Sequence, residues 1–388
     1  MKSVWNHYYS TTKRMLLWAG LWPYQRRRER LLRVTLLTMT GLSMIVPQIG
    51  KFIKCGKDVP CILATIPTHM FQLVVIVKLY TCQFYNSKIK YLTDQMYNDW
   101  KSVEIPEEYE IMKVYAIKAR LFSFIYVLYY LVGAPLFVLV SLTPKILDFL
   151  LPLNESRPPI LPYEAHYFVR DDMEYFYYIF FHALVGIVIV CVAILAHDCM
   201  IFTSIEHVCS IFAVAGFRFE NLANHENIDT LNNNPDDIYK QKIALSVHVH
   251  WRALQFAELL ENTFSITFVI QILIVTVAMS VTLLQVASQL NDAMETSRYL
   301  AYIGGQLIHL FCFSLQGQKL IDHSLEMHII VHWYKIPIKS QKMLLHVMRK
   351  CLQPNFLSAG KIYIFSLKSF TTVLQSSMSY FTVLASFE

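Results

Sequence analysis

Residues 176–196 read FYYIFFHALVGIVIVCVAILA, and this stretch contains no Asp, Glu, Lys or Arg. At about 1.5 Å per residue, a helix of this length crosses the roughly 30 Å of hydrocarbon in a bilayer. The whole chain has the same character, since 55% of its 388 residues are hydrophobic, 14% are aromatic and only 16% are charged. Soluble domains usually carry about a quarter charged residues. We therefore expect a membrane protein.

Six other apolar runs approach the length that a membrane-spanning helix needs. The predicted spans are Leu31–Ile49, Ile62–Cys82, Leu121–Leu142, Phe176–Ala196, Phe264–Ser288, Tyr299–Leu315 and Ile362–Phe387. A buried core helix would explain any one of these runs, but it does not explain seven of them in one chain. The expected fold is an all-α integral membrane protein with seven transmembrane helices.

The distribution of Lys and Arg predicts the orientation of the chain. The N-terminal segment and every second connection after it carry 24 basic residues, whereas the connections on the other side carry seven. The N-terminus is therefore expected in the cytoplasm, and an odd number of spans places Glu388 outside. The same bias, and contact with anionic membrane lipids, accounts for the net charge of +6 and for RRRER at Arg26–Arg30, so no nucleic-acid partner is expected.

Two features of the predicted external loops agree with this orientation. The only N-glycosylation sequon, NES at Asn154, lies in the loop between spans three and four. Of eight cysteines, Cys55 and Cys61 share the first external loop, where an oxidising environment allows a disulfide. The sequence leaves open whether Asn154 is modified and whether these two cysteines are bridged.

Three cytoplasmic stretches have apolar residues at helical spacing with charges between them. Residues 197–220 and 238–262 are predicted to extend spans four and five below the membrane, and residues 339–354 are predicted to form an amphipathic helix that stops at Pro354. Such helices bury their apolar faces only by packing together. A shared cytoplasmic helical bundle is therefore expected.

The last predicted span carries a polar stripe. Lys368, Thr372, Gln375 with Ser376, Ser379, Val383 and Ser386 recur three or four residues apart and so share one helical face. Lipid cannot satisfy a polar stripe, so this face either packs on neighbouring helices or borders water. Periodicity alone favours packing, but the change from polar residues to Val383 near the external end suits a water path that closes by dewetting.

The C-terminal sequence SLKSFTTVLQSSMSYFTVLASFE, Ser366 to Glu388, resembles the terminal signature of insect odorant receptors. LLHVMRKCLQPNFLSAGKIYIFSLKSF before it is similar to the junction between cytoplasmic helix and last span in that family, and HDCMIFTSIEHVCSIF and HVHWRALQFAELLENTF also fit. The related gustatory receptors share part of the terminal motif. The connection between spans four and five is short here and long in the co-receptor of the family, so the chain resembles a ligand-tuning subunit.

The resemblance implies a tetrameric, odorant-gated, non-selective cation channel at the plasma membrane, assembled with the odorant receptor co-receptor. It implies four regions: a cytoplasmic segment at residues 1–30, spans one to six with the ligand pocket at residues 31–315, cytoplasmic anchor helices at residues 316–358 and a pore-lining helix at residues 359–388. Alignment of the terminal motif places Val383 at the gate, Phe387 at a second narrow position and Ser386 facing the pore. In the co-receptor of the family, Leu occupies the position of Phe387 and Gln occupies the position of Ser386.

A volatile ligand needs a mostly apolar cavity with few polar groups. In the family this cavity lies in the outer half of the membrane among spans two, three, four and six. The matching candidates are His69, Gln72, Tyr129, Tyr130, Gly133, Tyr177, Phe180, Phe181, Tyr299, Tyr302 and Gln306. For each aromatic residue singly, a position in the interfacial belt or in helix packing is the competing interpretation.

Two other functional classes share single features with this sequence. A G-protein-coupled receptor also has seven spans but needs an external N-terminus. A metal-dependent membrane enzyme or transporter would use histidine clusters, and His248, His250, His323, His328 and His332 are candidates. Matching carboxylates and a repeated helical face are absent from that set, and no phosphate loop or nucleophile motif is evident. The sequence thus predicts no enzyme, no metal and no cofactor.

Overall fold

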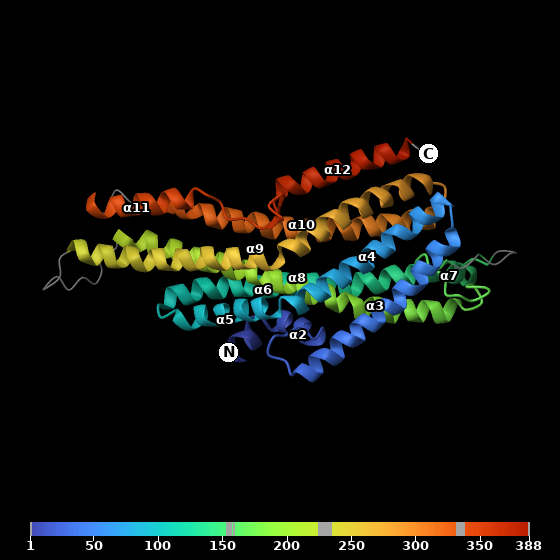
Figure 1. Cartoon of the computed structure of the whole chain (residues 1–388), viewed down its shortest axis with the longest axis horizontal. Helices are drawn as coiled ribbons and strands as arrows, with labels where there is room; N and C mark the ends of the chain where they lie inside the picture. The colour runs from blue at the N-terminus through green and yellow to red at the C-terminus, as the bar shows by residue number, and fades with distance from the viewer. Residues whose placement is uncertain (1, 153–156, 158–159, 224–234, 331–337, 387–388) are drawn as a thin grey trace.

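The computed structural model describes residues 2–152, 157, 160–223, 235–330 and 338–386, which form an elongated bundle of long helices (Figure 1). The elements are α1 (Lys2–His7), α2 (Ser10–Trp18), α3 (Arg27–Cys55), α4 (Val59–Phe84), α5 (Asn86–Ser102), α6 (Pro106–Leu139), η1 (Val140–Leu142), α7 (Thr143–Leu150), α8 (Phe176–Glu220), η2 (Asn221–Ala223), α9 (Pro235–Ser288), α10 (Ala293–Ile330), α11 (Ile338–Cys351), β1 (Ser358–Ala359), β2 (Tyr363–Ile364) and α12 (Leu367–Ala385). We call the two ends of the long axis the α7 end and the α11 end.

Helix α8 is the centre of the bundle. It runs unbroken for 45 residues, about 65 Å, and helices α2, α6, α9 and α10 pack around it. From Ala193 to Phe212 every side chain of α8 is buried. The charged residues of α8 lie in its second half, and burying them requires partners of opposite charge. Glu206 binds Lys319, and Arg218 binds Glu108.

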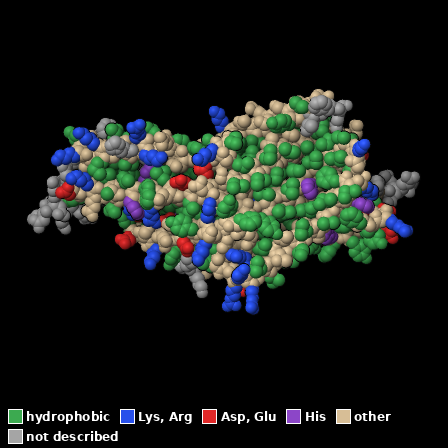
Figure 2. All heavy atoms as spheres, in the orientation of Figure 1, with side chains coloured by type: hydrophobic (Ala, Val, Ile, Leu, Met, Phe, Trp, Pro, Cys, Tyr) green, Lys and Arg blue, Asp and Glu red, His purple; other side chains and the backbone are tan. Residues whose placement is uncertain are grey.

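The α7 half of the molecule presents apolar side chains to its surroundings. Figure 2 shows a nearly continuous hydrophobic surface there, whereas most Lys and Arg side chains on this face lie toward the α11 end and along the lower edge. The exposed apolar residues recur at helical spacing, as in Leu36, Met39, Leu42, Val46 and Ile49 of α3. A contiguous apolar surface of this extent is typical of contact with lipid, which agrees with a membrane protein.

Five helices are long and apolar enough to cross a membrane by length and composition: α3, α4, α6 continued through α7, α8 and α9. Among the described residues α10 and α12 do not meet this criterion, because glycine, amide, imidazole and hydroxyl groups dilute their apolar runs. The predicted sixth and seventh spans lie on these two helices. The number of seven therefore stays a prediction.

The predicted continuation of spans four and five as longer unbroken helices is confirmed. Residues 197–220 belong to the same helix as span four, and residues 238–262 belong to the same helix as span five. The amphipathic helix expected at residues 339–354 is α11, which packs on α9 and α10. At the α11 end these elements form the shared helical bundle that the sequence predicted.

The N-terminal residues contribute to the core, which the sequence analysis missed. Trp5, Tyr9 and Leu16 are almost completely buried. The indole of Trp100 donates to the Tyr9 hydroxyl at 3.1 Å, and Thr12 shares a hydrogen bond of 2.7 Å with Thr203 of α8. The basic residues that dominate this segment masked the apolar face of α1 and α2.

The last span was predicted to begin at Ile362, and this boundary is wrong. Strands β1 and β2 form a small antiparallel hairpin, with Ser358 opposite Ile364 and Ala359 opposite Tyr363, and α12 begins only at Leu367. Gly360 and Lys361 both have positive φ angles, of 60° and 62°, at the turn. Phe365 follows the hairpin and is fully buried against Phe268 and Phe313, which fixes the start of α12.

The α7 end carries ordered connections. Cys55 and Cys61 are joined by a disulfide with their Cα atoms 5.6 Å apart. Glu164, in the segment between α7 and α8, binds Lys51 of α3 at 2.9 Å and Arg298 of α10 at 3.2 Å. Nearby, the backbone N–H of His166 donates to the Pro47 carbonyl at 2.9 Å. These contacts hold the segment against the ends of two long helices. Asn154 lies outside the described residues.

Candidate functional site

A cavity of about 440 Å³ lies between α4, α6, α8, α9 and α10, toward the α7 end of the bundle. It is lined by Pro67, Met70, Phe71, Val74, Tyr129, Tyr130, Gly133, Ala134, Phe137, Ile187, Cys191, Ile194, Ile274, Val275, Ala278, Ala301, Tyr302, Gly304, Gly305, Gln306, Ile308 and His309. The volume lies within the range of roughly 300–1,000 Å³ found for small-molecule pockets. Four of the five lining helices meet the length and composition criterion for a span, so this is a pocket within the predicted membrane region.

The lining is mostly apolar, and five side chains bring polar atoms to it. They are Tyr129, Tyr130, Tyr302, Gln306 and His309. Tyr302, Gln306 and His309 are spaced by four and three residues on α10 and therefore form a column along one helical face. A surface of aliphatic and aromatic groups with a few polar atoms suits a small, mostly apolar molecule.

The predicted ligand-binding residues divide into two groups. The cavity brings together Tyr129, Tyr130, Gly133, Tyr302 and Gln306. Gly133 contributes space to the cavity, because nothing lies within 4 Å of the position that a Cβ would occupy on it. The absence of a side chain there leaves part of the cavity open.

The other six predicted residues do not line the cavity. His69 meets Gln48 of α3 at 3.3 Å, and the Gln72 amide donates to the sulfur of Met44. Tyr299 is buried beside Arg298. Tyr177 and Phe181 are 64% and 66% exposed, on the surface of α8, and Phe180 is half-buried against the core. These positions correspond to helix packing and to the apolar surface, the interpretation that competed with ligand contact.

Sequence reasoning missed most of the lining, including every lining residue of α4 and α8. Helix α9 contributes Ile274, Val275 and Ala278, whereas the expected cavity drew on spans two, three, four and six only. His309 was also missed, although it follows the predicted Gln306 by three residues and so lies on the same face of its helix. That spacing was the signal available in the sequence.

A buried ionic cluster lies beside the cavity. Lys78 of α4 and Asp198 of α8 are both inaccessible, and the ammonium donates to the two carboxylate oxygens at 2.7 and 2.8 Å. Tyr126 donates to the same carboxylate at 2.8 Å, and His197 Nδ1 lies 2.8 Å from it. The Lys78 ammonium also lies 3.2 Å from Nε2 of His309. We call these five residues the Asp198 cluster.

The hydrogen bonds of the Asp198 cluster fix the state of His309. An ammonium only donates, so Nε2 of His309 accepts from Lys78 and the ring proton of the neutral imidazole sits on Nδ1. Nδ1 lies 2.8 Å from the Tyr126 oxygen and 3.2 Å from the Tyr130 oxygen. Of the Asp198 cluster only His309 lines the cavity, together with its neighbour Tyr130, and the members of the cluster lie on the four helices α4, α6, α8 and α10.

The predicted pore residues lie on an exposed face of α12. Thr372, Gln375, Ser379, Val383 and Ser386 are exposed in the single chain and Ser376 is half-buried. Helix α12 instead packs on α9 and α10 through Val373 and Ser377, which are buried. The polar stripe is therefore not covered by its own chain. Phe387 lies outside the described residues.

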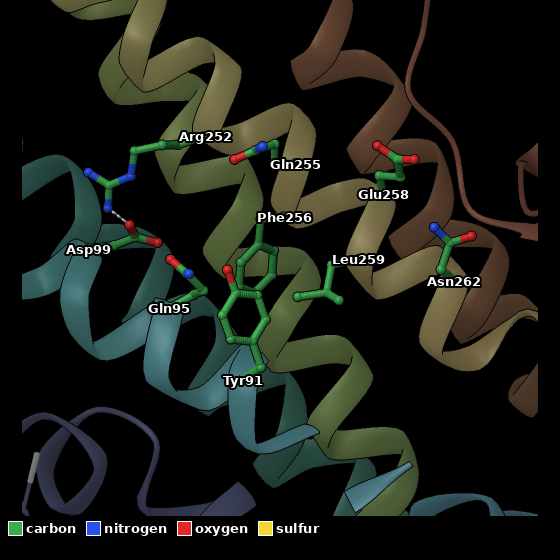
Figure 3. A pocket seen from close by; sticks show the side chains of 9 residues that line it. All are labelled: Tyr91, Gln95, Asp99, Arg252, Gln255, Phe256, Glu258, Leu259 and Asn262. Carbon is green, nitrogen blue, oxygen red and sulfur yellow. Dashed lines mark ion pairs between the residues drawn. The ribbon is translucent and has the colours of Figure 1, made fainter. Parts of the chain in front are cut away.

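A second hollow, of about 280 Å³, lies between α5 and α9 nearer the α11 end (Figure 3). Arg252 forms an ion pair with Asp99, which also lies 2.9 Å from Nε2 of His207. Tyr91 of α5 and Phe256 of α9 both line it, and Gln255, Glu258 and Asn262 lie along α9 (Figure 3). Its charged and amide groups would have to give up water for an apolar ligand, so the larger cavity is the candidate ligand site.

Comparison with known proteins assigns the fold and the family. A family model described as 7tm Odorant receptor matches residues 59–378. The chain is 23% identical to the odorant receptor coreceptor of Drosophila melanogaster over 167 residues, which are 42% of this chain and 34% of that protein. It is 25% identical to odorant receptor 13a of the same organism over 243 residues, 58% of this chain and 56% of that protein. The matched regions thus span about a third and just over half of these relatives.

The structure is similar to that of the insect olfactory receptor OR5 from Machilis hrabei. The TM-score is 0.78 with the complex of that receptor with eugenol, at 13% identity, and the match covers 99% of this chain and 100% of the other. A second structure of the same receptor gives a TM-score of 0.73 at 12% identity. At these identities the likeness establishes the fold.

Proposed function

The chain belongs to the 7tm odorant receptor family, and from that premise we propose that it is the ligand-tuning subunit of an odorant-gated, non-selective cation channel. The observation that carries the proposal is the mostly apolar cavity between α4, α6, α8, α9 and α10. Its size and its few polar atoms suit a small volatile molecule. The related receptor that was solved with eugenol supports a ligand of that size.

The pore is proposed to form around α12. A subunit that leaves the hydroxyl and amide groups of this helix uncovered by its own chain needs either partner subunits or water to meet them. Four α12 helices around one axis would provide a hydrated path, with Thr372, Gln375, Ser379 and Ser386 along it and Val383 as the apolar constriction. Phe387 is proposed as a second constriction and Ser376 as a residue at the border of the path.

The channel is proposed to be a hetero-tetramer with the odorant receptor co-receptor in the plasma membrane. The basic residues favour a cytoplasmic N-terminus and an extracellular C-terminus. The Cys55–Cys61 bridge at the α7 end supports the same orientation, because disulfides persist in oxidising compartments. The helices at the α11 end would then form the cytoplasmic anchor between subunits.

A cavity-filling substitution tests ligand binding in this cavity. Gly133→Leu places a Cβ where nothing lies within 4 Å and adds a branched side chain at the lining, so it reduces the volume that a ligand can occupy. We expect odorant-evoked current to fall at least about tenfold at normal surface expression, in cells that also produce the co-receptor and whose G-protein signalling is blocked. Gly41→Leu is the matched control, because Gly41 of α3 is also unobstructed and lies outside the cavity. Unchanged currents in Gly133→Leu would contradict a ligand site here.

A seven-helix G-protein-coupled receptor is the rival class, and a gustatory-type receptor channel is the nearer alternative. A G-protein-coupled receptor would have an external N-terminus, and its response would be lost when G-protein signalling is blocked. Epitope tags at each terminus, labelled on intact and permeabilised cells, separate the two orientations. Surface labelling of an N-terminal tag would overturn the channel proposal.

A further inference from the structure

We propose that ligands enter the cavity laterally, from the hydrocarbon of the membrane, through an opening between α6 and α10. This inference rests on the proposed function, since it concerns the route to the same ligand site. It also narrows the ligand class, because only a neutral, lipid-soluble molecule can reach the cavity through hydrocarbon. We call this place the lateral opening. Its borders are Tyr129 and Gly133 of α6 and Ala301, Gly305 and Ile308 of α10, all of which line the cavity.

Two of the residues that line the cavity are also exposed on the surface of the subunit. They are Ala301 and Ile308, and both belong to α10. About two helical turns separate them, so they lie on one face of the helix. Every other lining residue is buried or half-buried. The cavity therefore reaches the surface along this face of α10.

The exposed face of α10 adjoins α6. Gly305 lies on this face, since it follows Ala301 by four residues and precedes Ile308 by three. A Cβ placed on Gly305 would lie 3.8 Å from the hydroxyl oxygen of Tyr129, which belongs to α6. Elsewhere α10 packs on α8 and α9, and α6 packs chiefly on α8. The cavity thus reaches the surface between α6 and α10.

Side chains join α6 to α10 at both ends of the lateral opening. Toward the α7 end, the rings of Phe137 and Tyr302 have their centroids 4.7 Å apart. Toward the α11 end, Nδ1 of His309 lies 3.2 Å from the Tyr130 oxygen. The two contacts are equally far apart along both helices, by two turns or about 10 Å, so the helices run antiparallel and in register. The opening is therefore a window with fixed ends.

The two turns between these contacts contain small residues. They are Gly133 and Ala134 of α6 and Gly304 and Gly305 of α10. Nothing lies within 4 Å of the position that a Cβ would occupy on Gly133 or on Gly304. These positions therefore send no large side chain into the window, and a compact molecule can fit between the two helices there.

The surroundings of the lateral opening are apolar. Neither Leu121–Leu142 nor Tyr299–Leu315 contains Asp, Glu, Lys or Arg. Val132 and Leu136 of α6 are exposed beside the opening, and so is Leu300 of α10. A surface of this kind is suited to lipid tails, in which neutral apolar molecules concentrate and charged molecules are excluded. The opening thus connects the cavity to the hydrocarbon.

Tyr129 is the side chain that crosses the lateral opening. It is half-buried, and its hydroxyl oxygen reaches from α6 to Gly305 of α10. It makes no hydrogen bond with another described residue, and its ring contacts that of Tyr130 at a centroid distance of 5.4 Å. A side chain without a hydrogen bond changes rotamer rapidly and at low cost. Rotation of Tyr129 would therefore admit a ligand without movement of either helix.

The first test measures the rates of the response. Eugenol, geraniol and 1-octanol are applied by rapid perfusion to cells that produce the receptor and the co-receptor. Ala301→Trp narrows the opening at its border, so we expect the current to rise and to decay at least about threefold more slowly, while the half-maximal concentration changes less than about twofold. A residue on an entry route alters both rates alike, because the route does not change the bound state. Tyr129→Ala should accelerate both the rise and the decay.

Leu128→Trp is the matched control for an added indole. Leu128 is 51% exposed on α6 and does not line the cavity, so both rates should stay as in the unaltered receptor. Surface labelling of each variant measures folding and delivery.

A second measurement needs no ligand. Ala301→Cys is labelled with a nitroxide in receptor that is purified with the co-receptor and placed in phosphatidylcholine vesicles. We expect oxygen dissolved in the lipid to relax the spin strongly and a water-soluble nickel chelate to relax it weakly. The unaltered receptor, treated in the same way, gives the signal from its native cysteines.

The outcomes separate this inference from the proposed function. Unchanged rates in Ala301→Trp at normal surface expression, a change in half-maximal concentration as large as the change in rates, or access of the nickel chelate to the label would overturn the lateral route. Each would leave the receptor function in place. If none of the three odorants evoked current, that result would count against the function proposed for the cavity, and the spin label would still decide whether the opening faces hydrocarbon.

Discussion

At the scale of single residues, the Asp198 cluster carries a large electrostatic cost, because it contains two buried ions. Lys78 and Asp198 are inaccessible, so neither water nor lipid headgroups solvate their charges. The two ions are stabilised by each other, by Tyr126, His197 and His309, and by the Phe313 ring, whose centroid lies 5.2 Å from the Lys78 ammonium. Because the desolvation penalty of a buried ion is several kcal/mol, the pair is tolerated only as a pair.

Removal of one partner of this pair should therefore be worse than removal of both. We expect Lys78→Met or Asp198→Asn to lower the free energy of unfolding by about 3–5 kcal/mol, since either leaves a charge buried without its counter-ion. The combined variant Lys78→Met with Asp198→Asn should recover a large part of that loss. Thermal unfolding of the detergent-solubilised receptor, with surface expression beside it, measures this coupling. A double variant less stable than both single variants would contradict the pairing.

Glu164 is a second charged residue with a defined role, at the α7 end. Burial alone would raise the pKa of its carboxyl group, but Arg298 and Lys51 outweigh burial and hold the pKa below its ordinary value of 4.5. A carboxylate with a depressed pKa stabilises the folded state at every pH above the ordinary value, and the contribution is lost as the pH falls through the lowered value.

Glu164→Gln should thus cost about 1 kcal/mol of stability near neutral pH, since Arg298 keeps Glu295 as a partner at 2.6 Å. The difference from the unaltered chain should stay constant down to about pH 5 and shrink below it. Thermal unfolding across this pH range measures the difference. Glu174→Gln is the control, because Glu174 is exposed in the same segment and forms no ion pair with a described residue. A constant difference down to pH 3 would exclude this assignment.

At the scale of elements, α12 is defined by the contrast between its two faces. The covered face is anchored by Val373, Ser377 and, at its start, by Phe365 in the core. The uncovered face carries the polar stripe and Val383, which is 53% exposed. A helix with this division is held by its own chain on one side and is free to meet other subunits or water on the other.

The position of Val383 predicts its effect on conduction. Val383→Ser places a hydroxyl at the proposed constriction, so that water remains there in the closed state, and basal current should rise several-fold in cells that also produce the co-receptor. Met378→Ser is the control, because Met378 is an exposed residue on the opposite face of the same helix. Basal and evoked currents that match those of the unaltered receptor at equal surface expression would refute the role of Val383 as a gate.

The junction between α10 and α12 depends on a close approach at Gly317. A Cβ on this residue would overlap the carbonyl oxygen of Phe365, which belongs to the backbone and cannot rotate away. We expect Gly317→Ala to displace the start of α12 and to abolish evoked current or surface expression. Gly41→Ala, in an unobstructed helical position, should be neutral or slightly stabilising. Normal currents in Gly317→Ala would show that α12 is not fixed by this contact.

At the scale of the whole molecule, apolar periodicity predicted the long helices well and the cavity only in part. The runs that became α4, α8 and α9 were evident because charge is absent over some 20 residues. Helices α1 and α2 were missed because their aromatic residues are scattered among basic ones. The hairpin before α12 was missed since Tyr363 and Ile364 read equally well as the first residues of an apolar helix.

The sequence also did not show which of the predicted ligand-binding residues line the cavity. Five of the predicted residues line the cavity, and six do not. An aromatic residue in a span gives no sign in the sequence of whether it faces lipid, as Tyr177 does, or the interior, as Tyr130 does. Only the rotation of each helix decides this, and that rotation results from packing across the entire bundle.

The hydroxyl groups of α12 bear on how such a subunit is made. Thr372 donates to the Lys368 carbonyl at 3.2 Å, Ser379 to the Gln375 carbonyl at 3.0 Å and Ser386 to the Val383 carbonyl at 2.7 Å. Each of these side chains therefore satisfies its own proton within the helix that bears it. For these three hydroxyl groups a single newly inserted subunit carries little energetic cost in the bilayer, and the costly groups of the stripe are Lys368 and Gln375. The subunits of the proposed channel therefore need not be inserted into the membrane at the same time. Water can enter the path along α12 after the subunits have assembled.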